Sequence, residues 1–250
     1  MEIPGPPPPP THFPQPVSYL PHRVADPQDP PRELSGLAWG AIVSLGLVAL
    51  LSLARIVVDL QLRSAAGEEG DVPGAYDAFT GWTSLHGLVF LVSAGVFIAW
   101  FFRAYKNLRR LGVQNMRYGV GWAIGAWFIP IFSLIRPKQI ANDVWRGSER
   151  GLDVSAQWRQ VIVPPLVHWW WGLFLLQGLL TEIGRRMVES GYDKLFSFGT
   201  FEKGISQIEN GTAVDVVASI CTVAAAILAI MFVSQVSKRL DEIRNDAMQP

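Results

Sequence analysis

Cysteine is almost absent from this sequence, and charged residues are scarce. The single cysteine, Cys221, lies within an apolar run, which excludes an intrachain disulfide and a cysteine-rich metal site. Only 17% of the 250 residues are charged, whereas half are hydrophobic. Basic and acidic residues balance at 21 each, without the basic excess of a nucleic-acid-binding protein, so no nucleic-acid partner is predicted. This composition is typical of integral membrane proteins.

The motifs of familiar enzyme classes are also missing. The sequence has no His-Glu-x-x-His, no Gly-x-Ser-x-Gly, no Gly-rich phosphate loop and no motif of paired intramembrane aspartates. Two histidines, His86 and His168, fall in predicted spans, but roughly 15–20 Å apart in depth, so they cannot share one haem iron. We therefore predict no enzymatic activity, no cofactor and no metal, and keep an intramembrane enzyme as a third hypothesis.

Proline is concentrated at the N-terminus, where residues 1–33 contain 12 of the 18 prolines. Such a segment buries too little apolar surface to offset its ordering entropy, so we predict an extended, disordered tail with polyproline-II character. The tail has no basic start followed by an apolar core, so it does not resemble a cleavable signal peptide. It is either a solvated spacer or a docking segment for a cytoplasmic protein.

Four long apolar runs predict membrane-spanning helices at about residues 34–60, 80–104, 165–187 and 212–236. At 1.5 Å per residue, each is long enough to cross a hydrocarbon core of about 30 Å. The predicted fold is all-α, an integral membrane bundle of four helices within a membrane domain at residues 34–245. An acidic loop follows the first span, and a mixed-charge loop occupies residues 185–211.

A fifth apolar run, residues 120–135, is too short for a comfortable span and contains Pro130, which favours a break. Lysine and arginine concentrate on the cytoplasmic side of membrane proteins. If this run does not cross, 15 of these residues lie inside and 5 outside, whereas a crossing would leave 11 and 9. We therefore predict that residues 120–146 form a re-entrant or interfacial hairpin, with four spans and both termini in the cytoplasm.

Basic and aromatic residues gather on the predicted cytoplasmic side. This candidate cytoplasmic face comprises Arg103, Asn107, Arg109, Arg117, Trp122, Trp127, Arg136, Trp145 and Arg146. Such a surface suits anionic lipid headgroups, with about 1 kcal/mol for each charge close to the membrane surface. It equally suits a protein partner. The plainer alternative is that these charges only fix the topology.

Ionisable residues also recur at one depth on the opposite side. This candidate outer polar cluster comprises Arg55, Asp59, His86, Glu182 and Asp215. Ionisable groups in spans are functional candidates, so an outward-facing polar vestibule is one hypothesis. Local ion pairs, with long side chains reaching the headgroups, are the alternative.

Several of these stretches carry a family resemblance. They are WFFRAYKNLRRLG from residue 100, MRYGVGWAIGAWFIPIFSLIRPKQIANDVW from residue 116, HWWWGLFLL from residue 168 and ILAIMFVSQVSKRLDEI from residue 227. The chain resembles, over about residues 34–245, a bacterial membrane-protein family known as domain of unknown function 4328, common in actinobacteria. The resemblance implies this architecture and a bacterial inner (plasma) membrane. It implies no catalytic role.

Two functional hypotheses of different classes follow. The first is a non-enzymatic membrane scaffold or regulator whose basic and aromatic cytoplasmic face binds lipid headgroups or a protein partner. The second is a small transporter or channel subunit, in which the outer polar cluster and the broken hairpin line the pathway.

Overall fold

The protein is described by a computed structural model that covers residues 25–26, 28–67, 71–151 and 158–248, and all secondary structure in these residues is helical. The long helices are α1 (Ser35–Gly67), α2 (Val72–Arg110), α6 (Pro165–Leu195) and α7 (Phe201–Ala247). The short ones are α3 (Trp122–Gly125), α4 (Pro130–Ser133), α5 (Arg136–Gly147) and the 3₁₀ helix η1 (Trp158–Gln160). The predicted all-α class is confirmed.

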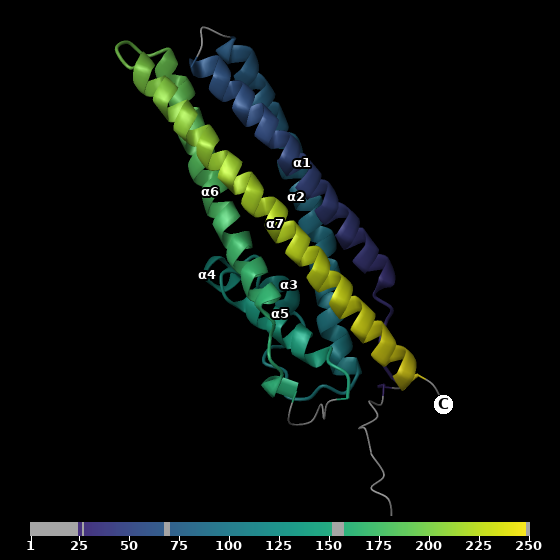
Figure 1. The fold of residues 1–250 in the computed structure, drawn as a ribbon. Coiled ribbons are helices and arrows are strands. Elements are labelled where there is room, and N and C mark those ends of the chain that lie inside the picture. Colours follow the sequence, from purple (N-terminus) through teal and green to yellow (C-terminus); the bar gives the residue numbers. More distant parts are fainter. Residues whose placement is uncertain (1–24, 27, 68–70, 152–157, 249–250) are drawn as a thin grey trace, which may run out of the picture.

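The four long helices run antiparallel as a row (Figure 1). α1 packs against both α2 and α7, and α7 packs along α6, so α2 and α6 are the first and last helices of the row. The row curves so that these two helices face each other, because the rings of Phe97 on α2 and Trp170 on α6 have centroids 5.7 Å apart. The α1–α2 and α6–α7 connections lie at one end of the row, which we call the loop end. The short helices α3, α4, α5 and η1 lie at the opposite end, which we call the basic end.

Three helices, α1, α2 and α7, are long and apolar enough to cross a membrane. Large apolar side chains on the surface of α1 recur from Trp39 to Leu60, and several are more than half exposed. At 1.5 Å per residue this stripe extends about 30 Å, the thickness of a hydrocarbon core. The chain is therefore a multi-pass membrane protein, and the exposed apolar side chains face lipid.

Helix α6 is not among these three, because polar residues such as His168, Gln177 and Glu182 lower its hydropathy. It nevertheless exposes an apolar stripe of its own, consisting of Trp169, Leu176, Leu179 and Ile183.

The predicted loop at residues 185–211 is wrong. Helix α6 continues to Leu195 and α7 begins at Phe201, so only residues 196–200 connect them. The helices continue because they pack closely through glycines: a Cβ on Gly191 would lie 2.8 Å from the carbonyl oxygen of Gly204. The predicted acidic loop is likewise mostly helical, since α1 reaches Gly67 and α2 begins at Val72.

The short apolar run at residues 120–135 forms no continuous helix. It contains α3 and α4, of four residues each, and Pro130 is the first residue of α4. The tip of this hairpin is apolar and exposed, with Phe128 and Ile131 each 73% accessible. Its inner side joins the aromatic core, where Trp127 packs edge-on against Phe97 and Trp171. The hairpin is therefore anchored inside the basic end and presents its tip outward.

The chain leading into α1 is held against the basic end. The side-chain amide of Asn107 donates to the carbonyl oxygen of Arg32 at 2.6 Å, and its oxygen accepts from the Arg32 backbone N–H at 3.0 Å. Asp29 pairs with Arg110 and, at 3.4 Å, with Lys106. Most of the predicted Pro-rich tail, residues 1–24 and 27, lies outside the described residues.

Candidate functional sites

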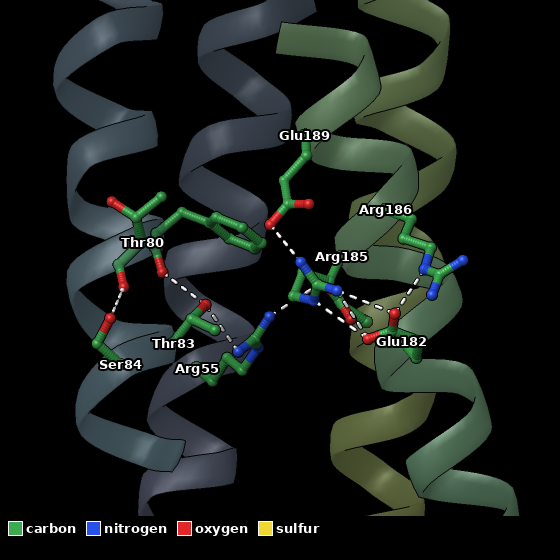
Figure 2. A network of polar contacts seen from close by, with 10 residues as sticks. Arg55, Thr80, Thr83, Ser84, Glu182, Arg185, Arg186 and Glu189 are labelled. Carbon is green, nitrogen blue, oxygen red and sulfur yellow. Dashed lines mark hydrogen bonds and ion pairs between the residues drawn. The ribbon is translucent and has the colours of Figure 1, made fainter. Parts of the chain in front are cut away.

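Three charged side chains meet in the interior near the loop end, and we call them the buried charge cluster: Arg55, Asp59 and Asp215. Arg55 Nη2 lies 3.0 Å from Asp215 Oδ2 on α7, and Arg55 Nε lies 3.7 Å from Asp59 Oδ2 one turn further along α1. A third contact, from Arg55 Nη1 to Thr83 Oγ1 at 3.0 Å, reaches α2 (Figure 2). None of the three charged residues is more than 5% exposed.

The buried charge cluster contains two carboxyl groups and one guanidinium. Among the described residues, neither oxygen of Asp59 has a hydrogen-bond partner, and Oδ1 of Asp215 also lacks one. Burial of a charge is costly unless the charge is paired and hydrogen-bonded. Arg55 thus donates hydrogen bonds to Thr83 and Asp215, whereas Asp59 has only the longer ion pair at 3.7 Å and no hydrogen bond among the described residues.

Four of the five residues predicted for the outer polar cluster come together. His86 lies next to the buried charge cluster, with Nε2 2.9 Å from Ser52 Oγ on α1. Glu182 instead forms surface ion pairs with Arg185 at 2.9 Å and Arg186 at 2.5 Å. Figure 2 shows these ion pairs on the helix beside Arg55.

Asp59 and Asp215, which the sequence predicted at one depth, share the guanidinium of Arg55, a contact that no sequence motif indicates. The two residues are far apart in the sequence, and only the packing of α1 on α7 brings them to one guanidinium. Gly184 on α6 makes room for this arrangement, because a Cβ there would lie 2.5 Å from Asp215 Oδ1. No sequence pattern at fixed spacing could have indicated it.

At the basic end, part of the predicted face is structural. Asn107 holds the chain before α1, and Trp127 belongs to the aromatic core. Trp145 stacks on Phe232 with ring centroids 6.3 Å apart and lies under the guanidinium of Arg239 at 4.4 Å. These three side chains make contacts that stabilise the fold.

Arg136 is enclosed by aromatic rings at the root of the hairpin. Its Cζ lies 3.7 Å from the ring centroids of both Trp122 and Phe132, and 5.2 Å from that of Tyr118. In the part of the chain that the structure describes, no salt bridge joins Arg136 to an acidic residue. Cation–π contacts of this kind stabilise a charge at a membrane boundary without neutralising it.

The remaining cations of the predicted cytoplasmic face differ in how exposed they are and in the groups that they contact. Arg109 is exposed and Arg103 is partly buried. Arg117 lies 4.0 Å from Asp143, and Arg146 donates from Nε to the carbonyl oxygen of Val161 at 2.9 Å. Residues 101–160 contain ten lysines and arginines but three acidic residues, so positive charge is in excess at this end.

Asp143 was not predicted as a site residue. It lies on the buried side of α5, is 1% exposed, and neither of its oxygens has a hydrogen-bond partner among the described residues. Burial raises the pKa of Asp143 to about 6, although Arg117, Arg146 and Arg159 act to lower it. In the sequence, Asp143 lies between the apolar residues Ile140 and Val144, which are also buried in α5. These neighbours could have indicated that Asp143 faces the interior.

An apolar cavity of about 270 Å³ lies between α2 and α6, at the depth of the exposed apolar stripes. Side chains from all four long helices line it, and Trp127 and Phe128 of the hairpin form its wall toward the basic end. Its polar residues are Ser93, Gln177 and Thr222, and the last two are joined by a hydrogen bond of 3.2 Å. Such a cavity suits an apolar ligand.

Comparison with known proteins gives one match. The family model described as domain of unknown function (DUF4328) matches residues 63–238, which include α2 through most of α7. No curated protein and no solved structure matches the chain. Within the described residues, no group of three or more histidine, cysteine, aspartate or glutamate side chains could hold a metal ion.

Proposed function

The chain belongs to the family of the domain of unknown function (DUF4328), whose description names no activity. We propose that this member is a non-enzymatic membrane scaffold or regulator that binds an anionic lipid at its basic end. The observation that carries the proposal is the apolar cavity directly above a basic and aromatic layer. An anionic lipid has the same two-part chemistry, an apolar chain and a charged headgroup.

The headgroup would contact cations that have no salt bridge to a carboxylate among the described residues. Arg109 is exposed, and Lys138 Nζ lies 2.8 Å from His168 Nδ1, a neighbour that offers no formal negative charge at neutral pH. Trp169, next to His168, is 67% exposed at the start of α6, as expected of a tryptophan at headgroup level. These residues offer charge and an interfacial anchor together.

The acyl chain would enter the cavity between α2 and α6. The backbones of α2 and α6 make few close contacts, and the lining of the cavity is almost entirely apolar, so entry between these helices from the bilayer is the route that we propose. Ala94 lies in its lining, and small side chains of α7 such as Ala225 and Ala229 widen it. An apolar chain gains more from such a surface than a polar solute would.

The proposed topology has four spans, including α6, with the basic end in the cytoplasm of a bacterium and both termini on that side. Supporting this, α6 exposes an apolar stripe from Trp169 to Ile183, about 21 Å along the helix at 1.5 Å per residue. The excess of arginine and lysine at residues 101–160 favours the cytoplasmic side. Docking of a cytoplasmic protein on the Pro-rich tail remains a prediction.

Native mass spectrometry of the detergent-solubilised full chain tests lipid binding. We expect the wild type to retain phosphatidylglycerol in preference to phosphatidylcholine. Replacing both Arg109 and Lys138 by glutamine should lower that preference about 30-fold, because each replacement removes about 1 kcal/mol of headgroup attraction. The matched control is Lys203→Gln, an exposed cation at the loop end, which should change nothing. Equal retention of both lipids by the wild type would refute the proposal.

A second pair of variants tests the acyl-chain site. Ala94→Phe fills the cavity and should reduce retention of both lipids. Leu88→Phe adds bulk on the same helix at a position that is 61% exposed and does not line the cavity, so it should retain lipid like the wild type. Equal loss in the two variants would mean that the cavity does not hold the chain.

The alternative, a small transporter or channel subunit, is favoured by the buried charge cluster alone. Solute uptake by proteoliposomes discriminates the two. Uptake that depends on Asp215 would support transport, whereas lipid retention without uptake supports the scaffold.

A further inference from the structure

The buried charge cluster carries more negative than positive charge in a region from which water is excluded. Arg55 is the only cation in it, and it lies against two carboxyl groups, Asp59 and Asp215. With both carboxylates ionised, the cluster would hold a net charge of −1 inside a membrane helix bundle. An uncompensated negative charge in such an interior is strongly unfavourable even after the protein relaxes around it.

We propose that this cluster is a proton-binding site, in which Asp59 is held as the neutral carboxylic acid. Binding converts the Asp59 carboxylate and one proton into a carboxyl group, which leaves the single ion pair of Arg55 with Asp215. The inference goes beyond lipid binding, because it concerns the opposite end of the molecule and a different ligand.

The geometry assigns the proton to Asp59. Asp215 Oδ2 accepts a hydrogen bond from Arg55 Nη2 at 3.0 Å, which stabilises its ionised form. Asp59 is 0% exposed, and its nearest approach to the guanidinium, 3.7 Å, is not a hydrogen bond. Of the two groups, Asp59 therefore gains more from being neutral.

The surroundings of the site favour a proton over a metal cation. On α2, Thr83 accepts a hydrogen bond from Arg55, and His86 is hydrogen-bonded to Ser52. Neither of these side chains adds a negative charge to the site. On α6, Arg185 lies beside Asp215 and adds positive charge, and Glu182 is already paired with Arg185 (Figure 2). A metal cation would need several oxygen ligands and would be repelled by two guanidinium groups, whereas a proton needs one carboxylate.

Infrared spectroscopy of the full chain in lipid bilayers at pH 6 tests the site, since exposed carboxyl groups are ionised at this pH. The experiment uses an Asp143→Asn background, which removes the buried acid at the basic end. We expect a C=O stretching band of a protonated carboxylic acid that shifts in D₂O and is lost in Asp59→Asn. The matched control, Asp77→Asn, removes an exposed carboxylate at the same end and should keep the band.

A second variant keeps the proposal testable if Asp59→Asn folds poorly. Asp215→Asn retains Asp59 but leaves one carboxyl group for one guanidinium, so Asp59 should ionise and the band should again disappear. Persistence of the band in Asp59→Asn would overturn the assignment. Absence of the band from the Asp143→Asn background, or its appearance only after sodium is removed, would also overturn the proposal, the latter in favour of a cation.

Discussion

Asp143 makes the stability of the basic end depend on pH. Its side chain is buried without a hydrogen-bond partner among the described residues, and burial raises its pKa from the ordinary 3.8 to about 6. Because the folded state binds this proton more tightly than the unfolded state does, the contribution to stability is complete below pH 3.8 and is lost as the pH rises through 6. The lost stabilisation is about 3 kcal/mol.

The Asp143→Asn variant should lack this pH dependence, because an amide does not titrate. We expect the melting temperature of the variant to rise relative to that of the wild type between pH 4.5 and pH 7.5, as measured by thermal unfolding in one detergent. Other carboxyl groups titrate in both proteins and cancel in the difference. A difference that stays constant with pH would mean that Asp143 is not a buried acid.

At the scale of elements, glycine spacing explains why the α6–α7 pair extends beyond the apolar region. Gly184 and Gly191 on α6 face Gly211 and Gly204 on α7, and each pair is seven residues apart along its helix. A Cβ on Gly191 would lie 2.8 Å from the Gly204 carbonyl oxygen and 2.9 Å from the backbone nitrogen of Ile208. Backbone atoms cannot yield as a flexible side chain would.

Gly191→Ala should therefore lower the stability of the protein by about 1–3 kcal/mol through overpacking. Gly178→Ala, on the same helix, meets nothing within 4 Å, and should be neutral or slightly stabilising because alanine favours helix. Apparent melting temperatures of both variants check this. Equal effects would show that the close approach of α6 and α7 does not contribute.

Helices could be predicted from the sequence where a long apolar run defines them, but not where packing between helices determines how far they extend. The runs at residues 34–60 and 212–236 gave α1 and α7, and Pro130 indicated the break that separates α3 and α4. Residues 185–211 were predicted as a loop because their charges suggested one, although the glycine repeat was already visible in the sequence. The sequence placed Arg55, Asp59 and Asp215 at one depth, but their contacts with one another and the cavity depend on packing between distant helices.

At the scale of the whole molecule, the two ends differ in charge and in construction. The basic end adds α3–α5 and an aromatic core to the helix row, whereas the loop end consists of helix extensions above the buried charge cluster. An asymmetric molecule of this kind fits a membrane whose two surfaces differ. The orientation that we propose, with the basic end in the cytoplasm, rests on the excess of arginine and lysine at that end.

Cysteine accessibility tests this orientation and the crossing of α6. In a Cys221→Ser background, Phe198→Cys introduces a thiol between α6 and α7, where the native side chain is fully exposed, and Arg150→Cys introduces one at the basic end. With four spans, an impermeant maleimide should label the first variant in intact cells, and the second only after the membrane is opened. If α6 does not cross, Phe198→Cys would resist labelling from outside. Labelling of Arg150→Cys in intact cells would reverse the orientation, and would move the proposed lipid site to the outer leaflet.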